Sequence, residues 1–349
     1  MSAKFGHASR MAHLRLASLV KAQNKTGSDG DASKFENETV EFANALGVLS
    51  DGVAFVLATA QHERSFGPAL IWAMQNKANA LRLFSDQRAG DLARIARYFQ
   101  FDSKVFEVDA SNVARVAEPI AVDYRETSAA DEMFANFIRS AGADVVSEHG
   151  VITGEVFGLE VCRVVHDASR STGTELAEAG RLEIGVGAHD RETFKLLHGQ
   201  TATVEALRDV VSDVAARRVV GAQTHPLNQL ARERLLRHIV CQSPQLVGAK
   251  SLQFAQPPLE RKGLKESVPC CAVGESLGGE KIVVVFSIGV DPDVVSFGAD
   301  ARGQLNRSAE LVLVMPSRDI LPVVERVAQL LERPARFVGV DVLNESNRA

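Results

Sequence analysis

Two glutamates occur inside apolar runs that predict β-strands near the centre of the chain. Glu160 belongs to residues 154–165 (GEVFGLEVCRVV) and Glu183 to residues 181–187 (RLEIGVG). Because side chains alternate along a strand, Glu160 is expected to share a face with Cys162. A carboxylate between buried neighbours is costly unless it meets a cation or a hydrogen-bond donor. These two positions are therefore the first candidates for chemistry.

The two carboxylates could hold a metal ion if they lie on one face of adjacent strands. Glu160 and Glu183 would then supply the oxygen ligands that Mg²⁺ or Mn²⁺ prefers. Asp190 and His189 follow the second strand directly, and we take Asp190 as the third ligand. An antiparallel sheet with one solvated face also presents acids at alternate positions, so an ordinary surface is the alternative.

The segment around these acids resembles the core of the restriction-endonuclease-like PD-(D/E)xK nucleases. A predicted helix, DVVSEHG, GEVFGLEVCRVV and RLEIGVG follow one another over residues 130–190. In that family a helix precedes a three-stranded meander with an acid on its second strand and an ExK motif on its third. The resemblance implies that Glu160 and Glu183 are metal ligands. Gly185 stands where the family has lysine, and Glu160 where aspartate is usual, so either another cation substitutes or the site is inactive.

A substitute cation is available on the predicted helix 226–241 (PLNQLARERLLRHIVC). Helical steps of 100° place Arg234 inside the apolar stripe, where an arginine usually answers a buried carboxylate or a phosphate. Arg234 is therefore expected to pair with Glu160 or Glu183 and to act in catalysis. Its stem could instead cover the core while its head reaches water, and that alternative stays open. Four further arginines make this region positive and are expected to contact nucleic acid: Arg217, Arg218, Arg232 and Arg237.

A second motif, Gly185-Val186-Gly187, lies between a predicted strand and a helix start. A dinucleotide-binding turn needs a third glycine, but this chain has Asp190 at that position, and its carboxylate would repel a pyrophosphate. No P-loop, nucleophile elbow or HExxH motif occurs. One tryptophan and two tyrosines offer few platforms for stacking bases, which disfavours single-strand binding through aromatic ladders.

Short apolar runs alternate with helical segments at both ends of the chain and predict an α/β fold. A strand–helix–strand–helix–strand pattern covers residues 53–109 and returns over residues 281–341. The first helix of each segment opens with the same tripeptide, Ser-Phe-Gly, at residues 65–67 and 296–298. An internal duplication would explain the match, although two unrelated βαβαβ segments would also share their apolar positions. A central β-meander and a helical insertion separate the two segments.

The chain divides into three parts by composition. Residues 1–40 hold a basic N-terminal helix and a linker rich in Gly, Ser and Asp, residues 41–125 an N-terminal α/β domain, and residues 126–349 the nuclease-like α/β domain. Within the last part, residues 190–241 form the helical insertion. Residues 242–280 contain several prolines and glycines and are predicted to form a long irregular loop, which is unusual inside a compact domain.

The composition is that of a globular protein with room for a large core. The 349 residues are 46% hydrophobic and 24% charged, with a net charge of −5. This balance disfavours a surface that binds polyanions everywhere but allows a local basic patch. The four cysteines show no metal-ligand spacing and suit a reducing cytoplasm. We expect no membrane span and no secretory signal.

These observations predict a nuclease-like protein that acts on nucleic acid or binds it, with Mg²⁺ or Mn²⁺ as the cofactor of an active hydrolase. One alternative is a non-catalytic scaffold or assembly protein that has kept the fold, because the motif lysine is missing. Another is a protein that binds a small phosphorylated metabolite at the strand ends near Asp86 and Asp291. Whether the chain forms oligomers stays open.

Overall fold

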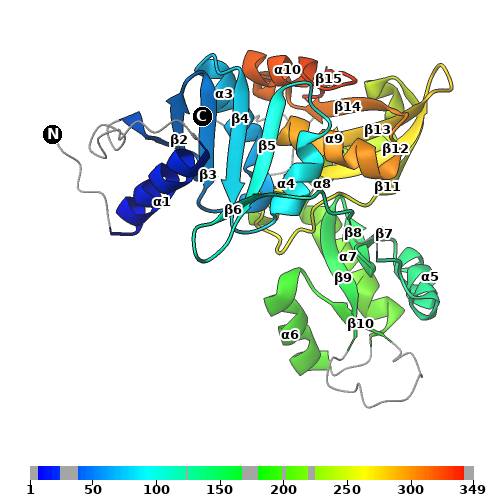
Figure 1. The fold of residues 1–349 in the computed structure, drawn as a ribbon. Helices are drawn as coiled ribbons and strands as arrows, with labels where there is room; N and C mark the ends of the chain where they lie inside the picture. Colours follow the sequence, from blue (N-terminus) through cyan, green and yellow to red (C-terminus); the bar gives the residue numbers. More distant parts are fainter. Residues whose placement is uncertain are drawn as a thin grey trace. The chain divides into compact units, whose positions relative to one another are not determined.

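The fold is described from a computed structural model of the chain, which covers residues 7–23, 38–122, 125–166, 180–198, 202–218 and 225–341. It is an α/β protein, as predicted, with three separate sheets (Figure 1). The chain forms two compact units. Unit 1 comprises Met1–Val122, Asp291–Asp300 and Leu321–Ala335, and unit 2 comprises Asp123–Val290, Ala301–Ile320 and Arg336–Ala349. The sequence divided the chain near residue 125, but it did not group the two later segments with unit 1.

Unit 1 contains a six-stranded sheet in the order β1-β2-β3-β4-β5-β6. Its strands are β1 (Val40–Phe42), β2 (Ala45–Ser50), β3 (Val53–Ala58), β4 (Ala80–Ser85), β5 (Asp102–Val108) and β6 (Ala114–Val116). The three central strands run parallel and the edges pair antiparallel. The first predicted βαβαβ segment is therefore confirmed.

The helices of unit 1 cover both faces of this sheet. They are α1 (His7–Gln23), the short 3-10 helix η1 (His62–Arg64), α3 (Phe66–Gln75), α4 (Ala89–Ala96) and α10 (Pro322–Gln329). Leu16 and Leu19 of α1 pack into one core with Leu57 and Phe84. On the opposite face Gly47 of β2 lies against Trp72 of α3, where a Cβ would come within 2.9 Å of the indole. The predicted N-terminal helix is confirmed as α1, whereas most of the predicted linker lies outside the described residues.

Unit 2 contains a five-stranded sheet in the order β11-β12-β13-β14-β15. Its strands are β11 (Ala249–Ala255), β12 (Cys270–Ser276), β13 (Lys281–Phe286), β14 (Glu310–Met315) and β15 (Arg336–Gly339). β13, β14 and β15 are parallel, and β12 pairs antiparallel with β13. The same order of an antiparallel strand followed by three parallel strands occurs in β2–β5, so the repeated topology extends beyond the predicted βαβαβ segments.

Residues 242–280 are not one irregular loop, because two of the five strands lie inside them. β11 and β12 pair antiparallel, with Phe254 opposite Ala272. The sequence AKSLQFA in β11 is an edge strand with mostly half-exposed or exposed side chains, so its apolar alternation is weak. The prolines occur outside the two strands, where no ladder hydrogen bond is lost.

A four-stranded antiparallel meander forms the second sheet of unit 2, in the order β10-β9-β8-β7. Its strands are β7 (Asp144–Glu148), β8 (Val151–Val156), β9 (Leu159–Val165) and β10 (Arg181–Ile184). The single strand predicted over residues 154–165 is wrong, because Phe157 and Gly158 both have positive φ and turn the chain between β8 and β9. Two such residues form the type I′ turn that matches strand twist, but Phe at its first position is not a usual turn residue.

The helices of unit 2 pack against both of its sheets. They are η2 (Ala129–Asp131), α5 (Glu132–Ser140), α6 (Gly187–His198), α7 (Val204–Arg217), η4 (Pro226–Gln229), α8 (Arg232–Gln242), η5 (Pro244–Val247) and η6 (Ser317–Asp319), while α9 (Val294–Leu305) is divided between the units. Ile138 of α5 and Leu207 of α7 pack in one core with Cys162 of β9. α8 packs against β11, β12 and β13, with Leu236 and Val240 in the core of the five-stranded sheet.

The helix predicted over residues 226–241 is interrupted. Leu230 is extended and Ala231 has a φ of 46°, so α8 begins only at Arg232. Buried Arg218 donates to the carbonyl oxygens of Leu227 and Ala231, on the two sides of the break. This hydrogen bonding stabilises a turn that helical periodicity alone does not reveal.

Across the described ranges, none of the helices combines the length and apolar character that crossing a membrane requires.

Candidate functional site

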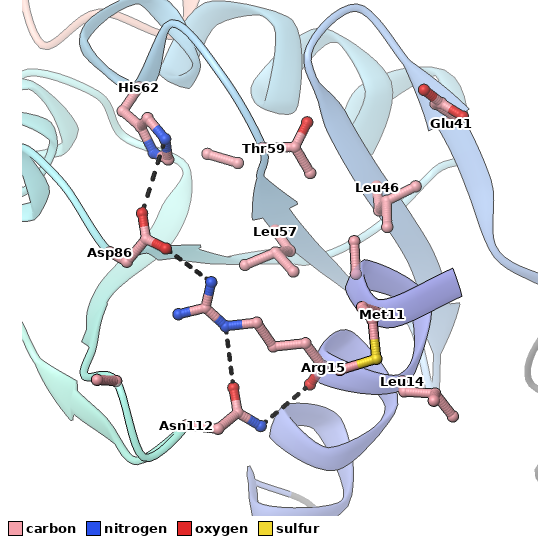
Figure 2. Close-up of a pocket in the computed structure, with 13 residues that line it drawn as sticks. Met11, Leu14, Arg15, Glu41, Leu46, Leu57, Thr59, His62, Asp86 and Asn112 are labelled. Atoms are coloured by element: carbon pink, nitrogen blue, oxygen red, sulfur yellow. Dashed lines mark hydrogen bonds and ion pairs between the residues drawn. The ribbon is translucent and has the colours of Figure 1, made fainter. Parts of the chain in front are cut away.

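A pocket of about 760 Å³ lies in unit 1, between α1 and the carboxyl ends of the parallel strands (Figure 2). Leu57 and Ala58 at the end of β3, Asp86 just after β4 and Asn112 after β5 contribute to its wall. The carboxyl ends of parallel strands are where α/β sheets usually bind ligands, because the loops there diverge. The volume lies within the range of small-molecule sites.

The pocket has an apolar part and a polar part. The apolar side chains come from α1, β2, β3 and the loop after β5: Met11, Ala12, Leu14, Leu46, Leu57, Ala58 and Ala110. The polar side chains are Arg15, Glu41, Thr59, His62, Asp86 and Asn112. Figure 2 shows Arg15 reaching from α1 between Asp86 and Asn112. A ligand here would find both an apolar surface and several hydrogen-bonding groups.

Asp86 lies at the centre of the polar part. Arg15 Nη1 is 2.7 Å from Asp86 Oδ2, and Arg15 Nε donates to Asn112 Oδ1 at 3.2 Å. His62 Nε2 lies 3.7 Å from the other carboxylate oxygen, Oδ1. The Arg15–Asp86 pair is about one-third exposed, so a ligand can replace either partner at modest cost.

The hydrogen bonds of Ser85 determine which nitrogen of His62 faces the pocket. Ser85 Oγ donates its proton to the carbonyl oxygen of Gln87 at 2.6 Å. His62 Nδ1 lies 2.8 Å from the same Oγ and must therefore donate to it. This assignment leaves Nε2 on the side of Asp86, where it can accept a hydrogen bond from a ligand.

Asp291, the second acid named with Asp86, does not line this pocket. Its Oδ2 is 2.6 Å from Arg64 Nη2 within unit 1. The neighbouring Asp293 accepts a hydrogen bond from the backbone N–H of Gly67 at 2.9 Å. Burial raises the pKa of Asp293 to about 7, although the nearby Arg64 lowers it. These acids connect α3 with the start of α9 inside unit 1.

The predicted acids of the meander lie on its polar face, opposite the core. Gly154 pairs with Cys162, but the next pair is Glu155 with Glu160, so Val161 is an extra residue in β9. This β-bulge changes the phase of alternation. Glu160 therefore does not share a face with Cys162, as simple alternation predicted, because Leu159, Val161 and Cys162 all belong to the core.

Both predicted metal ligands are paired with arginines. Glu160 Oε1 accepts from Arg163 Nε at 2.9 Å and from Arg191 Nη1 at 2.8 Å. Glu183 Oε1 accepts from Arg181 Nη2 at 2.8 Å, and its Oε2 lies 3.7 Å from Arg191 Nε. The structure thus brings Glu160 and Glu183 to one arginine, Arg191, which sequence reasoning missed.

The glycines of the GxG motif explain how Arg191 reaches the sheet. Gly185 has a φ of 140°, and a Cβ there would lie 2.6 Å from the backbone nitrogen of Arg191. Glycine thus lets the first turn of α6 pack directly on the end of β10. Asp190 and His189 are exposed on the same turn. Where side chains are described, no three His, Cys, Asp or Glu residues are grouped so that they could hold a metal ion, and the Mg²⁺ or Mn²⁺ site stays a prediction.

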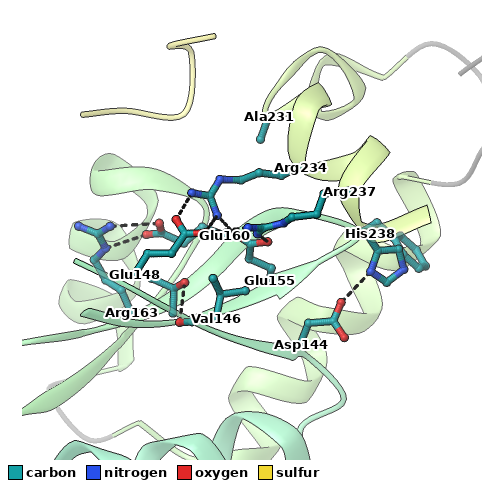
Figure 3. Close-up of polar contacts among 12 residues, drawn as sticks. Asp144, Val146, Glu148, Glu155, Glu160, Arg163, Ala231, Arg234, Arg237 and His238 are labelled. Atoms are coloured by element: carbon teal, nitrogen blue, oxygen red, sulfur yellow. Dashed lines mark hydrogen bonds and ion pairs between the residues drawn. The ribbon is translucent and has the colours of Figure 1, made fainter. Parts of the chain in front are cut away.

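Arg234 does pair with buried carboxylates, but not with the predicted ones. Figure 3 shows Arg234 and Arg237 of α8 between Glu148 of β7 and Glu155 of β8. Each arginine binds both acids, and Arg237 lies 2.7 Å from Glu148 and 3.0 Å from Glu155. Arg237 also stacks 4.4 Å from the ring centroid of Phe254. These four residues form the network that joins α8 to the meander.

The network is largely shielded from solvent. Arg237 is 0% exposed and Glu155 is 2% exposed. Burial would raise the pKa of Glu148, but Arg234 and Arg237 outweigh it and lower the pKa to about 2. Such a group of ionised, mutually hydrogen-bonded residues holds elements together. It leaves no room for Arg234 or Arg237 to contact a phosphate.

The other arginines expected to contact nucleic acid have different surroundings. Arg218 is buried, its donors are bound to the carbonyl oxygens of Phe157, Leu227 and Ala231, and burial lowers its pKa to about 10. Arg217 is exposed and pairs with Asp213 at 3.0 Å. Arg232 is partly exposed at the start of α8. The structure therefore gives Arg218 an internal structural role and leaves Arg217 and Arg232 at the surface.

Comparisons of the chain with protein-family models, with curated proteins and with solved structures found no match. The geometry of the sites themselves therefore carries the functional interpretation.

Proposed function

We propose that the protein binds a small organic molecule in the pocket between α1 and the strand ends of unit 1. The observation that carries this proposal is the convergence of Arg15, His62, Asp86 and Asn112 on a volume of about 760 Å³. Polar side chains of an internal network would be fully buried, but Arg15 and Asp86 remain about one-third exposed. Their arrangement suits a site that exchanges partners with a ligand.

The charges of the pocket favour a neutral or cationic ligand. Two carboxylates, Asp86 and Glu41, line the pocket, but only one permanently charged cation does, Arg15, which is already bound to Asp86. The two carboxylates would repel a phosphate group. We therefore replace the hypothesis of a phosphorylated metabolite with that of a ligand without a phosphate group. The ligand that fits has an apolar ring, which packs on Met11, Leu14 and neighbouring side chains, and hydroxyl or amino donors for Asp86.

A nucleoside has this chemistry. An acid after the second parallel strand is well placed to accept hydrogen bonds from ribose hydroxyls. Asp86 follows β4, the second of the three parallel strands. The first strand–helix turn, between Ala58 and Phe66, contains no glycine that would let a pyrophosphate approach the backbone. We therefore propose a nucleoside-type ligand rather than a dinucleotide.

Calorimetric titration with a panel of ribonucleosides and their 2′,3′-dideoxy forms tests this proposal. We expect ribonucleosides to bind and the dideoxy forms to bind more weakly. Asp86→Asn should weaken binding by about tenfold or more, because it removes a charge-assisted hydrogen bond. The matched control is Asp102→Asn, since Asp102 pairs with Arg82 at the opposite end of the same sheet.

Two results would refute the proposed function. One is the absence of binding to the wild-type protein for every nucleoside in the panel. The other is an equal change in affinity for Asp86→Asn and Asp102→Asn, which would place the ligand elsewhere. The nuclease hypothesis stays a separate prediction, and its carboxylates Glu160 and Glu183 lie on the meander of unit 2.

A further inference from the structure

A second, much smaller cavity lies in unit 2 between β10 and α6. Its volume is about 20 Å³, which is room for a group of the size of one water molecule or one oxygen atom. The charged residues that line it are Arg181 and Glu183 of β10 and Arg191 and Lys195 of α6. The remaining lining is apolar apart from the backbone: Leu182, Ile184, Phe194 and Ala202.

The charge in this cavity is unbalanced. Three cations line it, and only two carboxylates pair with them: Glu183, which also lines the cavity, and Glu160, which accepts from Arg191 at 2.8 Å. Glu183 is occupied, since Arg181 donates to it at 2.8 Å and Arg191 Nε lies 3.7 Å away. Among the described residues, Lys195 forms no ion pair. An additional negative group would therefore be attracted to the cavity.

Arg191 also has unused hydrogen-bonding capacity. Its Nη1 donates to Glu160, but its Nε is buried and makes no hydrogen bond among the described residues. Burial lowers the pKa of Arg191 below its usual value, although Glu160 and Glu183 act in the opposite direction. A buried N–H group without a partner is costly, and an oxyanion in the cavity would remove that cost.

We propose that this cavity is an anion site that takes one oxygen of a phosphate group, with Lys195 and Arg191 as its donors. Guanidinium and ammonium groups together are a common means of binding phosphate oxygens. The role of Glu183 differs between this proposal and the metal hypothesis. The Glu183 carboxylate would be a ligand of a metal ion, whereas it would repel a bound anion. The proposal is independent of the ligand pocket in unit 1.

The probe is sodium pyrophosphate at constant ionic strength, followed by the thermal unfolding midpoint and by calorimetry. We expect saturable binding to the wild-type protein and binding about tenfold weaker in Lys195→Gln, which removes one charged donor. The matched control is Lys250→Gln, because Lys250 is an exposed lysine on β11 of the same unit. Glu183→Gln should bind pyrophosphate more tightly than the wild type.

A short single-stranded oligonucleotide in the same assay distinguishes a free phosphate compound from a nucleic-acid backbone. Binding of either probe that depends on Lys195 supports the site, and the tighter probe identifies the source. The proposal is overturned if neither probe binds, or if Lys195→Gln and Lys250→Gln weaken binding equally. It is also overturned if Glu183→Gln weakens pyrophosphate binding and abolishes Mg²⁺ binding, since the carboxylate would then be a metal ligand.

Discussion

The α1 pocket of unit 1 and the α8 network of unit 2 use the same chemistry, arginine paired with carboxylate, for different ends. In the network, Arg237 is fully buried and each arginine binds both Glu148 and Glu155. In the pocket, Arg15 forms an ion pair with a single carboxylate, Asp86, and both side chains line the cavity. The comparison shows that residue type alone does not distinguish a structural arginine from one that is available to a ligand. The two are distinguished by the burial of the side chain and by the number of its hydrogen bonds to other residues of the protein.

The largest expected effect lies in the network. Glu155→Gln should destabilise the protein by about 3–5 kcal/mol, because it leaves Arg234 and Arg237 with less compensating charge in a buried place. The free energy of unfolding in urea measures this loss. Glu275→Gln is the matched control, since it removes the exposed partner of Lys281, and it should change stability little. An equal effect of both variants would mean that the network is not structural.

The two units should also respond to pH in opposite directions. The pKa of Asp293 is raised from 3.8 to about 7 by burial, so the folded state holds an extra proton between these values. Its contribution is complete below about pH 4 and is lost as the pH rises to about 7, on the order of 4 kcal/mol at most. Glu148, with its pKa lowered to about 2, contributes above about pH 4.5 and loses this contribution as the pH falls.

Urea unfolding between pH 3 and 8 tests the Asp293 part of this prediction. Asp293→Asn keeps an oxygen that can accept from the backbone N–H of Gly67, but it cannot titrate. The variant should therefore lose the decline in stability between about pH 4 and pH 7. A decline that persists unchanged in Asp293→Asn would show that another group causes it.

A smaller effect is expected at the turn between β8 and β9, which packs against the backbone of α8. Gly158 has a φ of 76°, and a Cβ there would overlap the backbone of Arg234. Gly158→Ala should cost about 2 kcal/mol or more, from backbone strain and from displacement of α8. Gly279→Ala is the control, because Gly279 has a φ of 85° but no atom within 4 Å of a Cβ, and it should lose only about 1 kcal/mol. Equal losses would mean that α8 can shift freely.

Apolar periodicity was sufficient to predict the parallel strands, because they are buried on both faces and continuous in sequence. Val53–Ala58 and Glu310–Met315 are such strands. It failed where one residue changes the geometry. Phe157 in a left-handed conformation divides β8 from β9, and Ala231 delays the start of α8. Tertiary contacts stabilise both changes, because Arg218 is bound to the carbonyl oxygens of Phe157 and Ala231. Gly158 is a local signal of the first turn, whereas the residues around Ala231 give no such signal of the second.

The candidate sites were predictable only in part. Asp86 was recognised because a strand end is visible in the sequence, but Arg15 comes from a helix far away along the chain and no local pattern connects the two. In the meander, the bulge at Val161 changed the face of Glu160. Arg234 was expected to pair with a buried carboxylate, and it does. Its partners, Glu148 and Glu155, are determined by the register of the sheet and could not be predicted from helix periodicity.

Two double-mutant cycles, measured by urea unfolding, test the contrast between pocket and network most directly. One cycle combines Arg15→Met with Asp86→Asn, and the other combines Arg237→Met with Glu155→Gln. The account predicts a coupling below about 1 kcal/mol for the pocket pair, since it is partly exposed, and above about 3 kcal/mol for the network pair. Equal coupling energies, or a larger coupling energy in the pocket, would contradict this account, because Arg15 and Asp86 would then stabilise the fold rather than form a ligand-binding site.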